Sequence, residues 1–192
     1  MKAKALLILG PSGAGKTTLI RRIMTFDERF RPARQYVTRS LRPGEFEKVQ
    51  VSESEFLELQ RSGKLIGVNS IYGMRTGTLV QSIEETLATG GFPVLDWPVS
   101  KAEEIAAAFS GCLYRVYVEP PSLEVLASRL GDGRDPHNER LMAANKELEA
   151  LWREDYARLI DYRVVNEDGK ANSVARTIYE RFIRDNFPMT GS

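Results

Sequence analysis

Short apolar runs alternate with amphipathic stretches along this chain of 192 residues. Unbroken apolar runs are typical of strands buried on both faces, and apolar spacings of three and four are typical of helices. The runs predict five strands: Ala5–Leu9, Gln35–Thr38, Pro93–Leu95, Tyr114–Val118 and Tyr162–Val165. The spaced stretches predict five helices: Thr17–Phe26, Lys101–Phe109, Leu123–Leu130, Arg140–Leu159 and Asn172–Phe187. We therefore expect an α/β fold with a doubly wound, parallel five-stranded sheet flanked by helices.

Residues 40–89 interrupt this alternation and predict a small inserted lobe. They contain two helix starts at which Ser or Thr precedes Glu or Gln by three positions, the spacing of a capping box. These boxes are Ser52 with Glu55 and Thr78 with Gln81. The core would then comprise residues 1–39 and 90–192 of a single domain that spans residues 1–192.

A second polar segment, at about residues 131–139, lies between two of the predicted helices. Its Gly, Asp, Pro and Asn residues favour a loop over regular structure. We expect this loop to act as a lid that closes over bound ligands.

The composition fits a globular domain whose partners are small molecules. Hydrophobic residues make up 42% of the chain, and 27 Lys+Arg against 26 Asp+Glu leave a formal net charge of +1. Because this balance supplies no broad basic field, we expect neither nucleic acid nor a membrane as partner. The single cysteine, Cys112, cannot form an intramolecular disulfide, and the apolar run Ala5–Leu9 is too short for a signal-peptide core. We therefore expect a cytoplasmic monomer or homodimer.

The strongest chemical motif follows the first predicted strand directly. The segment Gly10-Pro11-Ser12-Gly13-Ala14-Gly15-Lys16-Thr17-Thr18 matches G-x-x-x-x-G-K-[ST]. In such a phosphate loop, backbone N–H groups and a helix N-terminus surround a phosphate. The Lys16 ammonium would reach the β- and γ-phosphate oxygens, and the Thr17 hydroxyl would ligate Mg²⁺. The expected nucleotide-binding residues here are Gly10, Ser12, Gly13, Ala14, Gly15, Lys16, Thr17 and Thr18.

Asp96 is the second expected metal ligand. It ends an apolar run, and a carboxylate at the C-terminal edge of a strand can hold the water shell of Mg²⁺ opposite Thr17. The alternative is an Asp that caps the following helix. Pro98 separates Asp96 from that helix and favours the metal role.

Further segments follow the phosphate loop in a characteristic order. They are Tyr36-Val37-Thr38-Arg39-Ser40-Leu41-Arg42-Pro43-Gly44-Glu45, Gly73–Thr78, Pro120-Pro121-Ser122 with Arg129-Leu130, and Val164–Asp168. Together they resemble the guanylate kinase family over nearly the whole chain. A regulatory GTPase is disfavoured because the segment nearest to Asn-Lys-x-Asp, Asn166–Gly169, lacks the Lys. The resemblance implies a P-loop NTPase-type fold and transfer of the ATP γ-phosphoryl to the phosphate of a monophosphate acceptor, with Mg²⁺.

The resemblance also implies an acceptor site. The matching arginines, Arg39 and Arg42, would hold the acceptor phosphate, since the guanidinium fork suits bidentate contact with oxygen. Tyr72, Thr78 and Asp96 would bind the acceptor beside them. Taken alone, two surface arginines are usually only solvated.

On the donor side, the resemblance implies three catalytic cations and one further nucleotide contact. Arg134 in the lid and Arg140 on the next helix would act with Lys16 on the transferring phosphoryl group. Asn166 would lie beside the adenine. The alternatives are an ordinary charge on a helix face for Arg140 and a polar turn residue for Asn166.

The sequence departs from the family where guanine would be read. Gln35 stands in place of a Ser, Gly67 in place of an acidic residue, and Pro98 in place of the second Asp of an Asp-x-Asp pair. Thr76 replaces the tyrosine before Gly77. Because carboxylates satisfy the N–H donors of guanine, these changes leave the acceptor open.

Two alternative functions remain. The shortened lobe, the sequence Tyr36-x-Thr38-Arg39 and the sequence Asn166-x-Asp168-Gly169 are also similar to ribose 1,5-bisphosphate phosphokinase, which phosphorylates a sugar phosphate. A catalytically silent guanylate kinase-like binding module is the other alternative. Such modules typically lack the phosphate loop, which is complete here.

Overall fold

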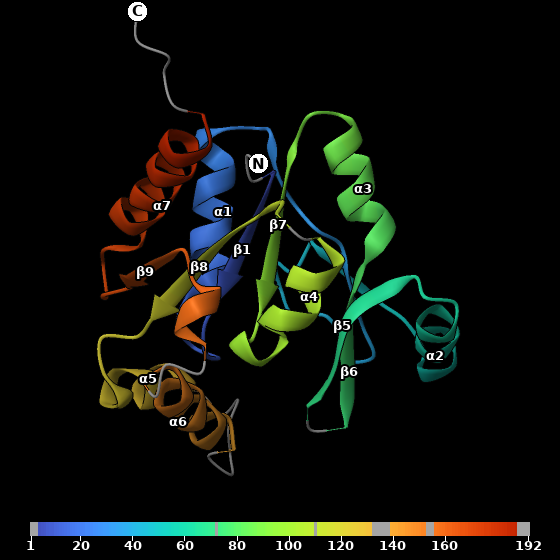
Figure 1. Cartoon of the computed structure of the whole chain (residues 1–192). Helices are drawn as coiled ribbons and strands as arrows, with labels where there is room; N and C mark the ends of the chain where they lie inside the picture. Colours follow the sequence, from blue (N-terminus) through green and yellow to red (C-terminus); the bar gives the residue numbers. More distant parts are fainter. Residues whose placement is uncertain (1–3, 72, 110, 132–138, 153–155, 188–192) are drawn as a thin grey trace, which may run out of the picture. The chain divides into compact units, whose positions relative to one another are not determined.

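A computed structural model of the chain describes residues 4–71, 73–109, 111–131, 139–152 and 156–187 (Figure 1). The strands are β1 Ala5–Leu9, β2 Phe30–Pro32, β3 Gln35–Val37, β4 Lys48–Gln50, β5 Leu65–Ile71, β6 Met74–Leu79, β7 Phe92–Trp97, β8 Leu113–Glu119 and β9 Tyr162–Val165. The α-helices are α1 Lys16–Phe26, α2 Glu53–Arg61, α3 Val80–Ala88, α4 Ala102–Ala108, α5 Leu123–Leu130, α6 Glu139–Trp152 and α7 Ala171–Asn186. Two short 3₁₀ turns, η1 Val99–Lys101 and η2 Ala157–Leu159, complete the described elements.

The larger sheet confirms the predicted α/β fold. Its five strands have the order β2-β7-β1-β8-β9, and β1 pairs in parallel with β8. Every residue of β1 is buried, which explains its unbroken apolar sequence. The sheet therefore places the end of β1, where the phosphate loop begins, among buried neighbouring strands.

One predicted strand lies in a different sheet. The sequence predicts Gln35–Thr38 as a strand of the five-stranded sheet, and this is wrong. The strand Gln35–Val37 belongs to a four-stranded sheet with the order β4-β3-β6-β5. The fifth place in the larger sheet is taken by Phe30–Pro32, paired with β7. This segment escaped the sequence pattern because Arg and Pro interrupt it, and proline is tolerated on an edge strand.

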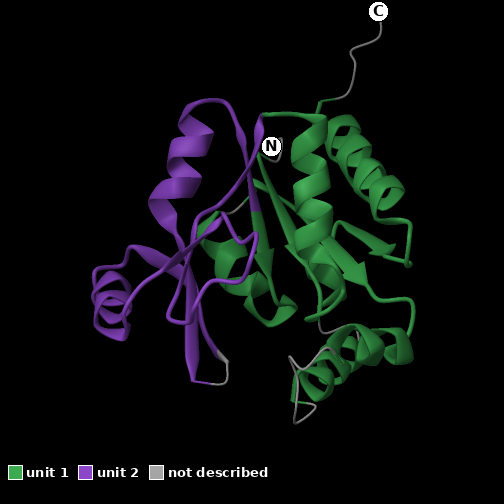
Figure 2. Ribbon diagram, turned by 180° about the vertical axis from the view of Figure 1, so that it is seen from behind, with its two compact units in different colours: residues 1–28, 95–192 green, residues 29–94 purple. Residues whose placement is uncertain are grey.

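The chain forms two compact units (Figure 2). Unit 1 comprises Met1–Glu28 with Leu95–Ser192, and unit 2 comprises Arg29–Val94. Unit 2 extends beyond residues 40–89 at both ends and has its own small core. Phe56 from α2 packs there with Leu65 and Leu79 of the four-stranded sheet.

The two expected capping boxes have different outcomes. The first is confirmed: the Ser52 hydroxyl accepts from the Glu55 N–H at 3.2 Å, and the Glu55 carboxylate accepts from the Ser52 N–H at 2.8 Å. The second is wrong, because Thr78 lies within β6 and α3 begins at Val80 without a side-chain cap. The pairing of Thr78 with a neighbouring strand overrides the local capping signal.

The predicted long helix at 140–159 is divided in the structure. Helix α6 runs over Glu139–Trp152, and a separate 3₁₀ turn occupies Ala157–Leu159. Most of the expected lid, including Arg134, lies outside the described residues, as does Tyr72.

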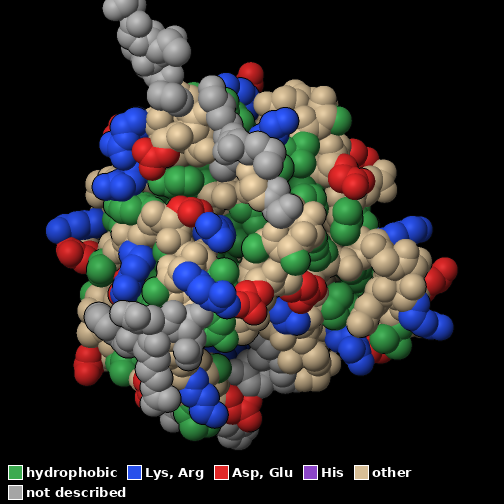
Figure 3. All heavy atoms as spheres, in the orientation of Figure 1, with side chains coloured by type: hydrophobic (Ala, Val, Ile, Leu, Met, Phe, Trp, Pro, Cys, Tyr) green, Lys and Arg blue, Asp and Glu red, His purple; other side chains and the backbone are tan. Residues whose placement is uncertain are grey.

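The surface carries charges of both signs. Basic and acidic side chains are interspersed over the face drawn in Figure 3, as the net charge of +1 leads one to expect. Within the described part of the chain, none of the helices has the length and apolar character needed to cross a bilayer.

Candidate active site

The phosphate loop joins β1 to α1 and contains two glycines at which a larger residue would force neighbouring atoms to move. Gly10 has a φ of 139°, and a Cβ there would lie 2.4 Å from the Val118 carbonyl oxygen. Gly15 has a φ of 93°, and its Cβ would lie 2.3 Å from the Asn166 amide nitrogen. Since L side chains rarely adopt such φ values, the tight loop requires glycine at both positions. Helix α1 then begins at Lys16, so its N-terminal N–H groups follow the loop directly.

Lys16 lies across its own loop. Its ammonium group donates to the Gly10 carbonyl at 2.7 Å and to the Pro11 carbonyl at 3.0 Å. The same nitrogen is 3.6 Å from the Asp96 carboxylate, and the Lys16 side chain is only 12% exposed. The cation is therefore held at the loop by groups that a phosphate anion can replace.

Thr17 and Asp96, the two expected metal ligands, lie side by side. The Thr17 hydroxyl donates to the Asp96 carboxylate at 3.5 Å. Oxygen atoms are the ligands that Mg²⁺ prefers, and Mg²⁺ usually takes one or two from protein and the rest from water and phosphate. No group of three or more His, Cys, Asp or Glu side chains that could hold a metal occurs in the described residues. The pair therefore fits Mg²⁺ bound with a nucleotide.

Asn166 and Arg129 stabilise the phosphate loop, which lies in the same unit 1. The buried Asn166 side chain donates to the Ala14 carbonyl at 2.9 Å, while its own amide oxygen is buried without a hydrogen-bond partner. Arg129 donates to the Asn166 backbone carbonyl at 2.8 Å and pairs with Asp168 at 2.6 Å. Sequence reasoning named Arg129 only as part of a motif, and the structure gives it this bracing role. Its position in the last turn of α5 was the available signal.

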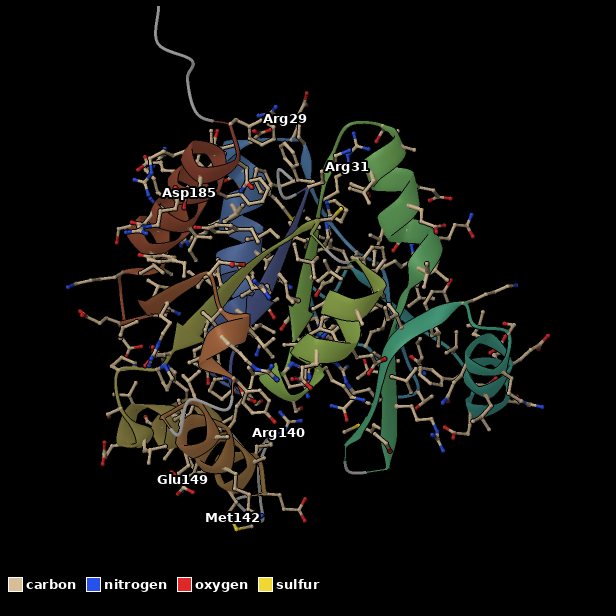
Figure 4. The ribbon with its side chains drawn as sticks, viewed as in Figure 1. Arg29, Arg31, Arg140, Met142, Glu149 and Asp185 are labelled. Atoms are coloured by element: carbon tan, nitrogen blue, oxygen red, sulfur yellow. The ribbon has the colours of Figure 1, made fainter. Side chains whose placement is uncertain are left out.

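Helix α6 carries Glu147, a second acidic side chain that interacts with Lys16, and sequence reasoning missed it. The Glu147 carboxylate accepts a hydrogen bond from the Tyr117 hydroxyl at 3.3 Å. Burial raises the pKa of Glu147, against the opposing effects of Lys16, the Tyr117 hydroxyl and the Val99 backbone N–H. Arg140 lies on the same helix, and Figure 4 shows it on the opposite side of α6 from the exposed Met142.

In unit 2, Arg39 is oriented by Glu45. Two nitrogens of its guanidinium donate to the two carboxylate oxygens at 2.7 and 2.6 Å. The Arg42 backbone N–H and the Lys48 ammonium also donate to Glu45, at 2.8 and 3.1 Å. Burial tends to raise the pKa of Glu45, but these three partners lower it to about 2. Glu45 is therefore an anion that holds in place both the Arg39 guanidinium and the turn at Arg42.

The four-stranded sheet carries three of the four positions where the sequence departs from the family, and the fourth, Pro98, precedes η1 in unit 1. Gln35 pairs with the buried Thr78, which also pairs with Ile66 of β5. Gly67 has a φ of 61°, and the register between β5 and β6 shifts beside it. An irregular backbone therefore occupies the position at which the family carries an acidic side chain.

The structure therefore places the site residues in two groups. In unit 1 it brings together Lys16, Thr17, Asp96 and Asn166 at the phosphate loop. In unit 2, Arg39 and Arg42 both bond to Glu45. The carboxylate partner of Arg39 was not part of the sequence-based site, although Glu45 lies within the same quoted motif.

A phosphate loop between a buried parallel strand and a helix, with a Thr–Asp pair beside it, defines a P-loop nucleotide-binding protein. The sequence model of the family "Guanylate kinase" matches residues 2–178. The chain belongs to the guanylate kinase family.

Two relatives agree with this assignment in sequence, and two solved structures are similar in fold alone. Guanylate kinase from Geobacter sulfurreducens is 33% identical over 177 residues, which cover 87% of this chain and 83% of that protein. Guanylate kinase from Methylobacillus flagellatus is 30% identical over 168 residues, with 84% and 83% covered. The crystal structure of guanylate kinase from Anaplasma phagocytophilum matches with a TM-score of 0.73 at 22% identity, over 98% of this chain and 88% of that one. Shikimate kinase from Acinetobacter baumannii in complex with shikimate matches with a TM-score of 0.53 at 14% identity, over 96% of each chain, which is a likeness of fold alone.

Proposed function

We propose that this protein is an ATP-dependent kinase that transfers the γ-phosphoryl group to the phosphate of a small monophosphate acceptor. The observation that carries the proposal is the complete phosphate loop, with the Lys16 ammonium and the Thr17 hydroxyl both beside the Asp96 carboxylate. Membership of the guanylate kinase family supports the same reaction class. The complete loop also argues against a catalytically silent binding module.

On the donor side, unit 1 supplies positioning and positive charge. The loop N–H groups would bind the ATP phosphates, and Lys16 would exchange the Gly10 and Pro11 carbonyls for phosphate oxygens. Mg²⁺, held through Thr17 and Asp96, supplies neutralisation of the phosphate charge when it is bound. Arg140, with Arg134, would stabilise the oxygens of the transferring group, since charge spreads over them in the transition state.

On the acceptor side, unit 2 supplies a phosphate contact. Glu45 holds the Arg39 guanidinium in a fixed plane, so that binding a phosphate costs little side-chain entropy. Arg42 would add a second cation, with Tyr72 and Thr78 as further acceptor contacts from the same unit. Both arginines would bind a dianionic phosphate whether it belongs to a nucleotide or to a sugar.

We propose GMP as the first acceptor to test, because the relatives of this chain are guanylate kinases. The second candidate is a phosphorylated sugar of the ribose 1,5-bisphosphate type. Gln35 and the left-handed Gly67 favour it, because neither supplies a carboxylate for the guanine N–H donors. A neutral amide is better suited to hydroxyl groups, which both donate and accept hydrogen bonds.

A coupled assay of ADP release separates these functions. It would use GMP, dGMP, AMP, CMP, UMP and ribose 1,5-bisphosphate as acceptors, each with Mg²⁺ and ATP. Turnover with GMP supports the nucleotide kinase, and turnover with the sugar phosphate alone supports the second candidate. No turnover with any acceptor, together with no heat of ATP binding in calorimetry, contradicts the kinase proposal and favours a binding module.

A further inference from the structure

Glu147 lies at a meeting point of three elements of unit 1. Its carboxylate accepts from the hydroxyl of Tyr117 on β8, which is fully buried, and from the backbone N–H of Val99 in η1. It also interacts electrostatically with Lys16 at the start of α1. Because a partly buried carboxylate is costly to desolvate, its place there depends on these three partners.

In its ionised form, Glu147 opposes the binding of an anion. A carboxylate beside a phosphate loop repels the phosphates of a nucleotide, and the repulsion is strong where solvent is excluded. Asp96 also faces Lys16, but the proposed contact with Mg²⁺ offsets its charge. No metal contact is proposed for Glu147, so affinity for ATP does not explain its presence.

Helix geometry connects Glu147 to Arg140. The two residues are seven positions apart on α6, about two turns, so both side chains project from the same side of the helix. Glu149, nine positions from Arg140, projects from the opposite side and is exposed. The contacts of Glu147 with β8 and η1 therefore fix the side of α6 from which Arg140 extends.

We propose that Glu147 is a positioning residue for phosphoryl transfer, which holds helix α6 against Lys16, β8 and η1 so that Arg140 and Lys16 act on the same phosphoryl group. This inference rests on the proposed kinase function and deepens it. Glu147 contributes to the geometry of the transition state and not to the affinity for ATP. Its removal should therefore separate kcat from ATP binding.

The test compares Glu147→Gln with Glu149→Gln. Both replace a carboxylate on the same helix with an amide of the same shape, but only the first removes a carboxylate that interacts with Lys16. For Glu147→Gln we expect kcat to fall by about tenfold or more, while the Kd for ATP in calorimetry stays the same or decreases. For Glu149→Gln we expect both values to stay within about twofold of the parent.

A double-mutant cycle with Arg140→Ala tests the connection between the two residues. If Glu147 acts by placing Arg140, the Glu147→Gln change should cost much less in the Arg140→Ala background than in the parent. Additive losses in kcat would contradict the proposal.

Tyr117→Phe gives a second test if Glu147→Gln does not fold. It keeps the carboxylate and removes one of its hydrogen bonds, so we expect a smaller fall in kcat, of about threefold to tenfold, at unchanged ATP affinity. An unchanged kcat in an active, folded Glu147→Gln variant, or a loss of ATP affinity that accounts for the whole defect, overturns the inference and leaves the kinase function standing. A parent enzyme inactive towards every acceptor overturns the kinase function itself.

Discussion

At the scale of single residues, the site depends on charges that hold one another in place. Lys16 is bound by two loop carbonyls and Asp96, and Arg39 is bound by Glu45. The motif residues were predictable, because a phosphate loop has a nearly invariant sequence. Their carboxylate partners were not all predictable, because an acidic side chain gives no local signal of the cation that it meets after folding.

Lys16→Ala tests the donor site. We expect kcat/KM to fall by more than about a hundredfold, since the ammonium would contact phosphates most strongly in the transition state. Steady-state kinetics of ADP release measures the change, with the exposed Lys64→Ala as control. Activity close to that of the parent would contradict the role of the loop.

Glu45→Gln tests the ion pair in unit 2. The pKa of Glu45 is lowered to about 2, so its ionised form stabilises the fold above pH 4.5 and this contribution is lost as the pH falls towards 2. We expect the variant to lose about 2 kcal/mol of unfolding free energy at pH 7. The difference from the parent should shrink to about half or less at pH 3.

Urea unfolding at both pH values gives the comparison for Glu45. The exposed Glu58→Gln in the same unit is the matched control, with little change expected at either pH. A difference between Glu45→Gln and the parent that does not depend on pH would mean that Glu45 stabilises through packing and not through its charge.

At the scale of elements, sequence periodicity predicted most of the larger sheet and failed where elements are short. The run Ala5–Leu9 is buried along its whole length and was predicted within its exact bounds. The strand Phe30–Pro32 has three residues, one of them exposed, and carries no period that could be recognised. Gln35–Val37 was predicted as a strand but assigned to the wrong sheet, because pairing partners are set by tertiary contacts.

The two capping sequences give an element-scale test. Ser52→Ala removes a formed N-cap of α2, so we expect a loss of about 1 kcal/mol of unfolding free energy. Gln81→Ala removes the Gln of a box that is not formed, together with an exposed hydrogen bond to Glu85 on the same helix, so we expect a change within about 0.5 kcal/mol. Thermal and urea unfolding measure both variants. Equal losses would contradict the finding that only the first of these two boxes is formed.

At the scale of the whole molecule, the order of the motifs carried more information than any one of them. The phosphate loop alone predicted a nucleotide-binding protein, and the arginine motif in residues 36–45 added an acceptor phosphate. The pattern of apolar runs could not predict that unit 2 begins at Arg29 and ends at Val94, because β7 passes from one unit into the other without a break. The sequence pattern also does not identify the acceptor. Gln35 and Gly67 lack the groups that would bind guanine, but they do not indicate which other group is bound.

Our main proposal is that the phosphate group of a small monophosphate, and not water or a protein segment, accepts the γ-phosphoryl group of ATP. Phosphorus NMR of the parent protein with Mg²⁺, ATP and each acceptor in turn follows both products at once. We expect the γ signal of ATP to decline as new diphosphate signals from one acceptor appear, and both changes to vanish with Lys16→Ala. An undiminished ATP spectrum with every acceptor, or ADP and inorganic phosphate as the only new products, would contradict the proposal.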